Sequence, residues 1–241
     1  MKLRVLGSSS AGNCYILEND EEVLLIEAGL PMKYINEALD FDYSKVSGCL
    51  VSHRHGDHCL SLDKLDGLVD IYCGIDVAEH KNIKFFTEAV PLKHYMIGGF
   101  YVIPFEVCHD VPCLGYFIGH KDLGKLVFIT DSAYSDYTFK GVNHIMVECN
   151  YDIDSLDEAI KKGVTPSFQK NRLIQTHMEL NETINVIKNN IDEGVENIIL
   201  LHLSPRNSNE LLMMEKVTNS IGLKPYVART GLEVELTERP Y

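Results

Sequence analysis

Ser52-His53-Arg54-His55-Gly56-Asp57-His58 reads H-x-H-x-D-H, so three imidazoles and one carboxylate fall within six consecutive residues. Histidine is the side chain that most often binds a metal ion, and a carboxylate completes a mixed nitrogen and oxygen ligand set. The apolar run Gly48-Cys49-Leu50-Val51 precedes the motif, so we expect the motif to begin where a buried strand ends. A solvated polar turn without a ligand is the alternative interpretation.

The composition of the 241 residues is typical of a globular protein, with 45% hydrophobic and 24% charged residues. No apolar run is long enough to cross a bilayer, and Met1-Lys2-Leu3-Arg4 leads into a predicted strand without the apolar segment of a signal peptide. The seven cysteines are scattered and form no C-x-x-C pair, a pattern that favours reduced thiols. We therefore expect a cytoplasmic protein with no membrane partner.

The formal net charge of −13 argues against a broad electrostatic surface for nucleic acid. It does not exclude a local one, because two bound divalent ions would add about four positive charges at the point where an anion binds. A small phosphodiester, or the end of a nucleic acid, suits this charge better than a long duplex does.

Strand-like segments alternate with amphipathic helical segments along the whole chain. No linker, change of composition or internal repeat separates them, so we predict one domain of layered sheets and helices over residues 1–241. Pro104 indicates an edge position or a bulge in its strand, and Asn181 is expected to cap a helix. The predicted strands cover residues 3–6, 14–18, 22–26, 48–51, 70–73, 101–107, 114–118, 125–129, 145–147 and 197–201, and two short strands close the chain. The predicted helices cover residues 31–39, 60–68, 75–80, 155–161 and 209–221, with another beginning at Asn181.

Four predicted strands are each followed by a residue that can bind a metal. The first precedes the H-x-H-x-D-H motif, and the others precede His109, Asp131 and His202. A single histidine after a strand is more often a structural residue. The fourfold repetition instead predicts one site built at a common sheet edge.

The order of these residues resembles that of the metallo-β-lactamase-fold hydrolases. The resemblance covers nearly the whole chain, and it implies an α/β protein with a four-layer αββα sandwich of two mixed β-sheets and a dinuclear site at one sheet edge. Carried over to this chain, the family's ligand set gives His53, His55 and His109 to one metal and Asp57, His58 and His202 to the other, with Asp131 bridging the two.

Three shorter motifs look like the YycJ-like branch of this superfamily. They are the stretches 7–14 (GSSSAGNC), 148–152 (ECNYD) and 202–207 (HLSPRN). The branch implies phosphodiester or nuclease-type chemistry, and DNA processing has been ascribed to some of its members. The chain is also similar, more distantly, to the tRNA 3′-processing endonucleases, which carry an extra histidine about one strand before the last ligand; Thr176-His177 stands 25 positions before His202.

The chain departs from the family pattern at two places. Glu27-Ala28-Gly29 stands where the family has Asp-x-Gly, so Glu27 is expected to support the metal loop in a different way. His177-Met178-Glu179-Leu180-Asn181 lacks the usual His-x-Ser/Thr and is one residue longer. A surface histidine therefore remains the alternative role for His177.

The expected chemistry is hydrolysis by a metal-bridging hydroxide that Asp57 orients while it also binds metal. His177 is the candidate proton donor to the leaving group, held by Glu148, for which a structural carboxylate is the alternative role. The ligand set suits two divalent ions, zinc first, with manganese or iron as alternatives. The expected substrate contacts are Ser9, Asn13, Arg206 and Asn207, of which Arg206 has a surface cation as its alternative role.

The leading functional hypothesis is a dinuclear metal-dependent phosphodiesterase or nuclease that acts on a small phosphodiester or a nucleic-acid end. A thioester or lactone hydrolase with the same metal site is the alternative, and a non-catalytic metal-binding module is a third. Only 70 residues separate Asp131 from His202, which leaves no room for the large inserted domain of the repair nucleases of this superfamily. The oligomeric state stays open.

Overall fold

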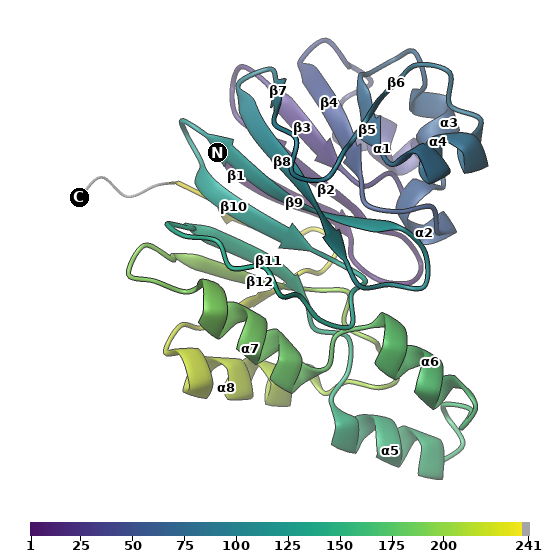
Figure 1. The fold of residues 1–241 in the computed structure, drawn as a ribbon, viewed down its shortest axis with the longest axis vertical. Coiled ribbons are helices and arrows are strands. Elements are labelled where there is room, and N and C mark those ends of the chain that lie inside the picture. The colour runs from purple at the N-terminus through teal and green to yellow at the C-terminus, as the bar shows by residue number, and fades with distance from the viewer. Residues whose placement is uncertain (238–241) are drawn as a thin grey trace.

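Two mixed β-sheets face each other and carry helices on their outer sides (Figure 1). The structure is a computed structural model that describes residues 1–237. Within them, each sheet has seven strands, in the orders β14-β1-β2-β3-β4-β5-β6 and β13-β12-β11-β10-β9-β8-β7. The last four residues of the predicted domain, 238–241, lie outside the described part of the chain.

The first sheet contains the H-x-H-x-D-H motif at the end of one of its parallel strands. Its β1, β2 and β3 pair antiparallel, whereas β3 to β6 pair parallel. Its strands are β1 (Lys2–Gly7), β2 (Cys14–Glu18), β3 (Val23–Ile26), β4 (Val46–Val51), β5 (Ile71–Cys73), β6 (Phe86–Glu88) and β14 (Glu233–Glu235), and its helices are α1 (Met32–Ala38), α2 (Gly56–Cys59), α3 (Leu62–Leu65) and α4 (Ile75–Lys81).

The second sheet repeats this mixture of antiparallel and parallel pairing. Its β7 to β10 pair antiparallel, and β10 to β13 pair parallel. Its strands are β7 (Tyr95–Ile97), β8 (Phe100–Val107), β9 (Cys113–His120), β10 (Gly124–Ile129), β11 (His144–Glu148), β12 (Asn197–Leu201) and β13 (Tyr226–Val227), and the helices that follow are α5 (Ile153–Lys161), α6 (Gln169–Thr176), α7 (Leu180–Asn190) and α8 (Glu210–Ile221).

The buried side chains form three apolar layers. One lies between the sheets and joins Tyr15 and Leu50 of the first sheet to Phe128 of the second. A second layer packs the first sheet against α1, α3 and α4, and a third packs the second sheet against α7 and α8. Burial on both faces explains why β11 and β12 are almost continuously apolar. The predicted αββα sandwich is confirmed.

Local features of the chain agree with the predictions only in part. Glu179, rather than Asn181, caps α7, because its carboxylate accepts a hydrogen bond from the Asn181 amide. Helix α6 and the three-residue strands β6 and β7 were not expected. Pro104 lies at an edge of β8 beyond the β7 ladder, which covers only Phe100–Val102, and its carbonyl accepts a hydrogen bond from the Leu92 amide at 2.8 Å. No helix within residues 1–237 is long and apolar enough to span a membrane.

Candidate metal centre

The ends of four strands meet at one edge between the two sheets. Strand β4 leads into the H-x-H-x-D-H motif, and the loops after β8, β10 and β12 carry His109, Asp131 and His202. Asp131 and His202 have φ angles of 46° and 53°, a backbone conformation that non-glycine residues rarely adopt. Such backbone strain clusters at functional sites.

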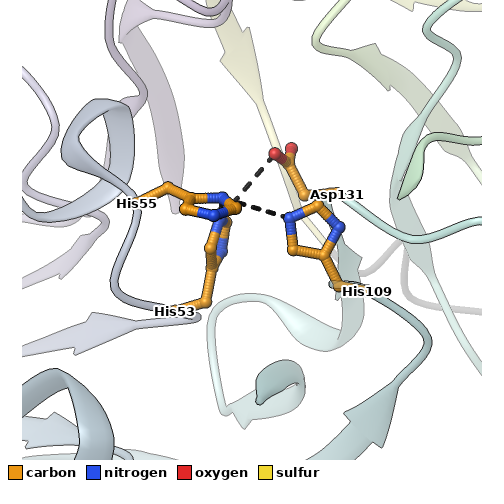
Figure 2. Close-up of side chains that lie close together, drawn as sticks. All are labelled: His53, His55, His109 and Asp131. Carbon is orange, nitrogen blue, oxygen red and sulfur yellow. Dashed lines mark hydrogen bonds and ion pairs between the residues drawn. The ribbon is translucent and has the colours of Figure 1, made fainter. Parts of the chain in front are cut away.

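Three histidines and one aspartate point toward one another in the first group of candidate ligands (Figure 2). The Nε2 atoms of His53 and His109 lie 3.0 and 3.2 Å from Nδ1 of His55, and Nε2 of His53 lies 3.8 Å from Oδ2 of Asp131. One possible ligand atom from each residue lies within 4.8 Å of all the others. A zinc ion needs nitrogen and oxygen ligands at about 2.0–2.2 Å, so these atoms fit around one ion after small adjustments.

The protonation of these histidines also suits metal binding. Burial lowers the pKa of His53 well below its ordinary value and lowers that of His109, so both imidazoles are neutral near pH 7. His109 donates through Nδ1 to the carbonyl of Thr176 at 2.9 Å. This contact leaves the lone pair of the His109 Nε2 atom directed at the ligand group.

The second group contains Asp57, His58 and Asp131. Nε2 of His58 lies 3.4 Å from Oδ2 of Asp57 and 3.3 Å from Oδ2 of Asp131. His202 lies against the same carboxylates, with Nδ1 2.5 Å from Oδ1 of Asp131 and Nε2 3.9 Å from Oδ2 of Asp57. Asp131 belongs to both groups, as a bridging ligand would, and it also belongs to a third group with Glu148, His177 and His202.

The electrostatics of this second group keep its carboxylates ionised. Burial opposes charge on Asp131, but His202 and His58 outweigh burial and hold its pKa well below the usual value. Burial likewise opposes charge on Asp57, and the hydrogen bond and charge of His58 lower its pKa nonetheless. Burial opposes charge on His58, but Asp131 and Glu27 outweigh burial and raise its pKa well above the ordinary value, so a metal ion bound here would displace the proton of His58. Carboxylates and imidazoles together form a donor set that suits divalent zinc, manganese or iron.

Buried residues contact the loop that carries Asp57 and His58 and hold it in place. Glu27 is fully buried, its Oε1 atom lies 3.5 Å from Nδ1 of His58, and burial raises its pKa. Gly29 passes so close to this loop that a Cβ atom there would lie 1.7 Å from the carbonyl oxygen of Asp57. Asn13 donates from its backbone to the same carbonyl at 2.8 Å, and its Nδ2 atom lies 3.0 Å from Nε2 of His58.

His177 and Glu148 form an ion pair beside the ligand groups. Nδ1 of His177 lies 2.7 Å from Oε1 of Glu148, whose Oε2 accepts hydrogen bonds from the amides of Ser132 and Met178. Glu148 is fully buried at the end of β11. Burial opposes charge on His177, but the ion pair outweighs it and raises the pKa of His177 to about 9. Within residues 1–237 no hydrogen bond engages Nε2 of His177.

A cavity of about 530 Å³ opens over the candidate ligands. His53 and His58 lie behind it with no exposed surface. Helix α6 supplies part of its wall. Six of the predicted site residues line it, namely His55, Asp57, His109, Asp131, His177 and His202.

The four predicted substrate contacts are not brought to this cavity wall. Asn13 is buried within the metal loop, and Asn207 is buried with its Oδ1 atom accepting a hydrogen bond from Thr165 at 2.6 Å. Arg206 is exposed outside the cavity. Ser9 accepts a hydrogen bond from the Ala11 amide, while its neighbour Ser10 reaches the wall.

The sequence analysis missed two residues of the site, Asp110 and Arg172. Oδ1 of Asp110 lies 3.4 Å from Nε2 of His55 and 3.2 Å from Nε2 of His109, and its Oδ2 accepts from Nη2 of Arg172 at 3.2 Å. Asp110 directly follows a predicted ligand, a signal that could have identified it. Arg172 belongs to the unexpected helix α6, so nothing in its local sequence indicated its position.

The fold is that of a known class of protein. Residues 9–107 match the family model described as the Metallo-beta-lactamase superfamily. It is 27% identical over 253 residues to the Exodeoxyribonuclease YycJ of Bacillus anthracis, a match that covers 97% of this chain and 94% of the relative. The predicted resemblance to the YycJ-like branch is therefore confirmed.

Solved structures agree with the fold. The metallo-beta-lactamase fold protein YhfI from Bacillus subtilis superimposes with a TM-score of 0.76 at 18% identity, over 97% of this chain and 99% of the other. A diphosphatase from the PhnP family gives a TM-score of 0.66 at 18% identity, over 99% of both chains. At this identity, both similarities concern the fold alone.

Proposed function

We propose that this chain is a dinuclear metal-dependent phosphodiesterase of the nuclease type. The observation that carries the proposal is His177, which the buried Glu148 holds, in the wall of the same cavity as two ligand groups that share Asp131. The cluster supplies sites for two metal ions, and the pair supplies a proton donor. The name of the similar exodeoxyribonuclease supports the same chemistry.

In the proposed metal site, His53, His55 and His109 hold one ion, and Asp57, His58 and His202 hold the other, with Asp131 between them. Two divalent ions bound there would act as Lewis acids on the phosphoryl group and supply a hydroxide nucleophile near neutral pH. The nitrogen-rich ligand set favours zinc.

Asp57 has the position of the residue that orients the attacking water. Its side chain is 22% exposed, whereas that of Asp131 is 3% exposed, so an Asp57 oxygen faces the cavity. Because its pKa is lowered, the carboxylate accepts hydrogen bonds at neutral pH.

His177 would donate a proton to the departing alkoxide. Glu148 binds Nδ1 and fixes the orientation of the ring, which leaves the Nε2 proton for the cavity. An alkoxide is a poor leaving group without a proton, so this donor matters for a phosphodiester of a sugar. A thioester or lactone hydrolase built on the same ligands would not need it.

We further propose that residues 1–241 form a single domain. The apolar layer between the sheets draws its side chains from both halves of the chain, from Met1 to Leu236. Neither sheet could bury its inner face alone.

A substrate panel tests the proposed function. Protein loaded with zinc or manganese is assayed against bis-p-nitrophenyl phosphate, a single-stranded oligonucleotide, a thioester and a lactone. We expect cleavage of both phosphodiesters and its loss in Asp131→Ala. Cleavage of the thioester or lactone with both phosphodiesters left intact would overturn the proposal, and turnover of no substrate at stoichiometric metal would favour a binding module.

A further inference from the structure

One face of α6 forms a wall of the cavity beside the candidate ligands. The wall residues are Phe168, which precedes the helix, and Gln169, Arg172, Leu173 and Thr176. They recur at the three- and four-residue spacing that places side chains on one side of a helix. One wall of the cavity is therefore formed by a single face of a helix.

The position of this wall is fixed relative to the ligand cluster. Its last residue, Thr176, accepts a hydrogen bond from His109 through its carbonyl, and His177 follows at once with its bond to Glu148. At the other side of the helix, Lys170 pairs with Asp157 of α5. Side chains on α6 are thus held at a set distance from the site.

Phe168 exposes an aromatic ring to this cavity. The residue is 80% exposed, and α6 buries Thr176 alone, so packing of the helix does not account for Phe168. Exposed phenylalanines elsewhere, Phe41 and Phe85, do not line the cavity. An accessible aromatic face can stack on a nucleobase of any sequence, with a contribution of about 1–3 kcal/mol per base.

Arg172 places a guanidinium group between Phe168 and the ligand cluster. Its Nη2 atom binds Oδ2 of Asp110, whose other oxygen lies within 3.4 Å of Nε2 of both His55 and His109. The side chain of Arg172 is 72% exposed and keeps donors for another anion. Phe168 and Arg172 are one helical turn apart, about 6 Å along the axis, so one short stretch of nucleotide can reach both.

We propose that the α6 wall holds the end of a single-stranded nucleic acid, with Phe168 stacked on a base and Arg172 bound to a backbone phosphate. This inference rests on the proposed phosphodiesterase function and names its substrate class. Inside a duplex both faces of a base are covered by its stacked neighbours, so an internal base can present a face to Phe168 only in a single strand. A chain with net charge −13 and one arginine on this wall also lacks the cationic surface that a duplex requires.

The absence of tryptophan from the chain permits a direct test. Phe168→Trp introduces a single fluorophore on the wall, and Phe85→Trp places a matched one at a 69% exposed position away from the cavity. Metal-loaded protein is titrated with phosphorothioate-linked oligothymidylate, which resists cleavage, with oligouridylate of equal length and with a DNA duplex. We expect quenching of Phe168→Trp by either single strand, and no change in Phe85→Trp.

Affinity measurements on substituted proteins complete the test. Phe168→Ala should weaken single-strand binding by about 5- to 150-fold, and Arg172→Gln should reduce its salt dependence. Arg229→Gln is the matched control, because Arg229 also pairs with a carboxylate, Glu210, but lies outside the cavity. Phe85→Ala, at an exposed position outside the cavity, is the second control and should leave both oligonucleotide affinity and phosphodiester turnover unchanged.

Several results would overturn the inference while leaving the function intact. These are unchanged oligonucleotide affinity in Phe168→Ala, equal quenching by the duplex, or a Phe168→Trp signal that follows protein concentration alone, which would indicate self-association. If the wild-type protein binds single strands through Phe168 but hydrolyses no phosphodiester, the proposed function fails instead.

Discussion

Replacing His177 by glutamine should separate proton donation from metal chemistry. Glutamine can keep a hydrogen bond to Glu148 but cannot transfer a proton as imidazolium does. A positioned general acid contributes about 10²–10⁴-fold to a rate, or about 3–5 kcal/mol of transition-state stabilisation. We expect a loss of this size in kcat for an oligonucleotide, whose leaving group is a sugar alkoxide.

The same substitution should have little effect on an activated substrate. The p-nitrophenolate ion leaves without a proton, so turnover of bis-p-nitrophenyl phosphate should fall by less than about tenfold. His177 belongs to neither proposed metal site, so metal content should be unchanged. The assay compares kcat for the two substrates at matched metal content, with His80→Gln as the control because His80 is exposed and outside the cavity.

Equal losses on both substrates would refute the proton-donor role of His177. They would instead mean that the side chain supports the metal site or the fold. A full rate on the oligonucleotide would show that the ion pair with Glu148 is structural.

Further predictions concern the metal loop and acid stability. Gly29→Ala should destabilise the protein by about 1–3 kcal/mol in chemical unfolding and reduce metal retention, because its Cβ meets the Asp57 carbonyl; Gly56→Ala, with nothing within 4 Å, should change neither, and equal behaviour of the two variants would contradict the packing argument. Glu27→Gln should weaken metal affinity by about 10–100-fold in a chelator competition, since it weakens the support of His58; unchanged affinity would remove Glu27 from the site. Burial lowers the pKa of His144 to about 4, so between pH 6.5 and 4 the unfolded chain binds a proton that the folded chain does not. The free energy of unfolding should therefore decrease as the pH is lowered through that window, by up to about 1.4 kcal/mol per pH unit. His144→Gln should make this pH dependence shallower, and an unchanged pH dependence would contradict the role of His144.

The ends of the long strands could be predicted because their sequence signal is local. An apolar run such as Ile198–Leu201, followed by His202, predicts both the strand and the candidate ligand at its end. Parallel pairing of β10, β11 and β12 then brings the loops after them to one edge. The order of ligands along the chain supplied the rest through its resemblance to a known superfamily.

The α6 wall of the cavity could not be predicted because the sequence of α6 carries little sign of a helix. Within α6 only Thr176 is buried, no side chain caps its start, and its position depends on hydrogen bonds to distant residues such as His109. For Asn13 and Asn207 the local sequence suggested a role, but the tertiary structure places the two side chains elsewhere. They look like ligand contacts in a polar loop, but tertiary packing turns them inward to bind Asp57 and Thr165.

The most direct test of a two-ion hydrolase is a metal titration of chelator-stripped protein followed by phosphodiester hydrolysis. Asp131 belongs to both ligand groups, so both ions should depend on it. We predict that zinc binds at two equivalents per chain, that hydrolysis reaches its maximum only at the second, and that Asp131→Ala abolishes it. Full activity in the stripped protein, or no activity at any zinc content, would contradict the account.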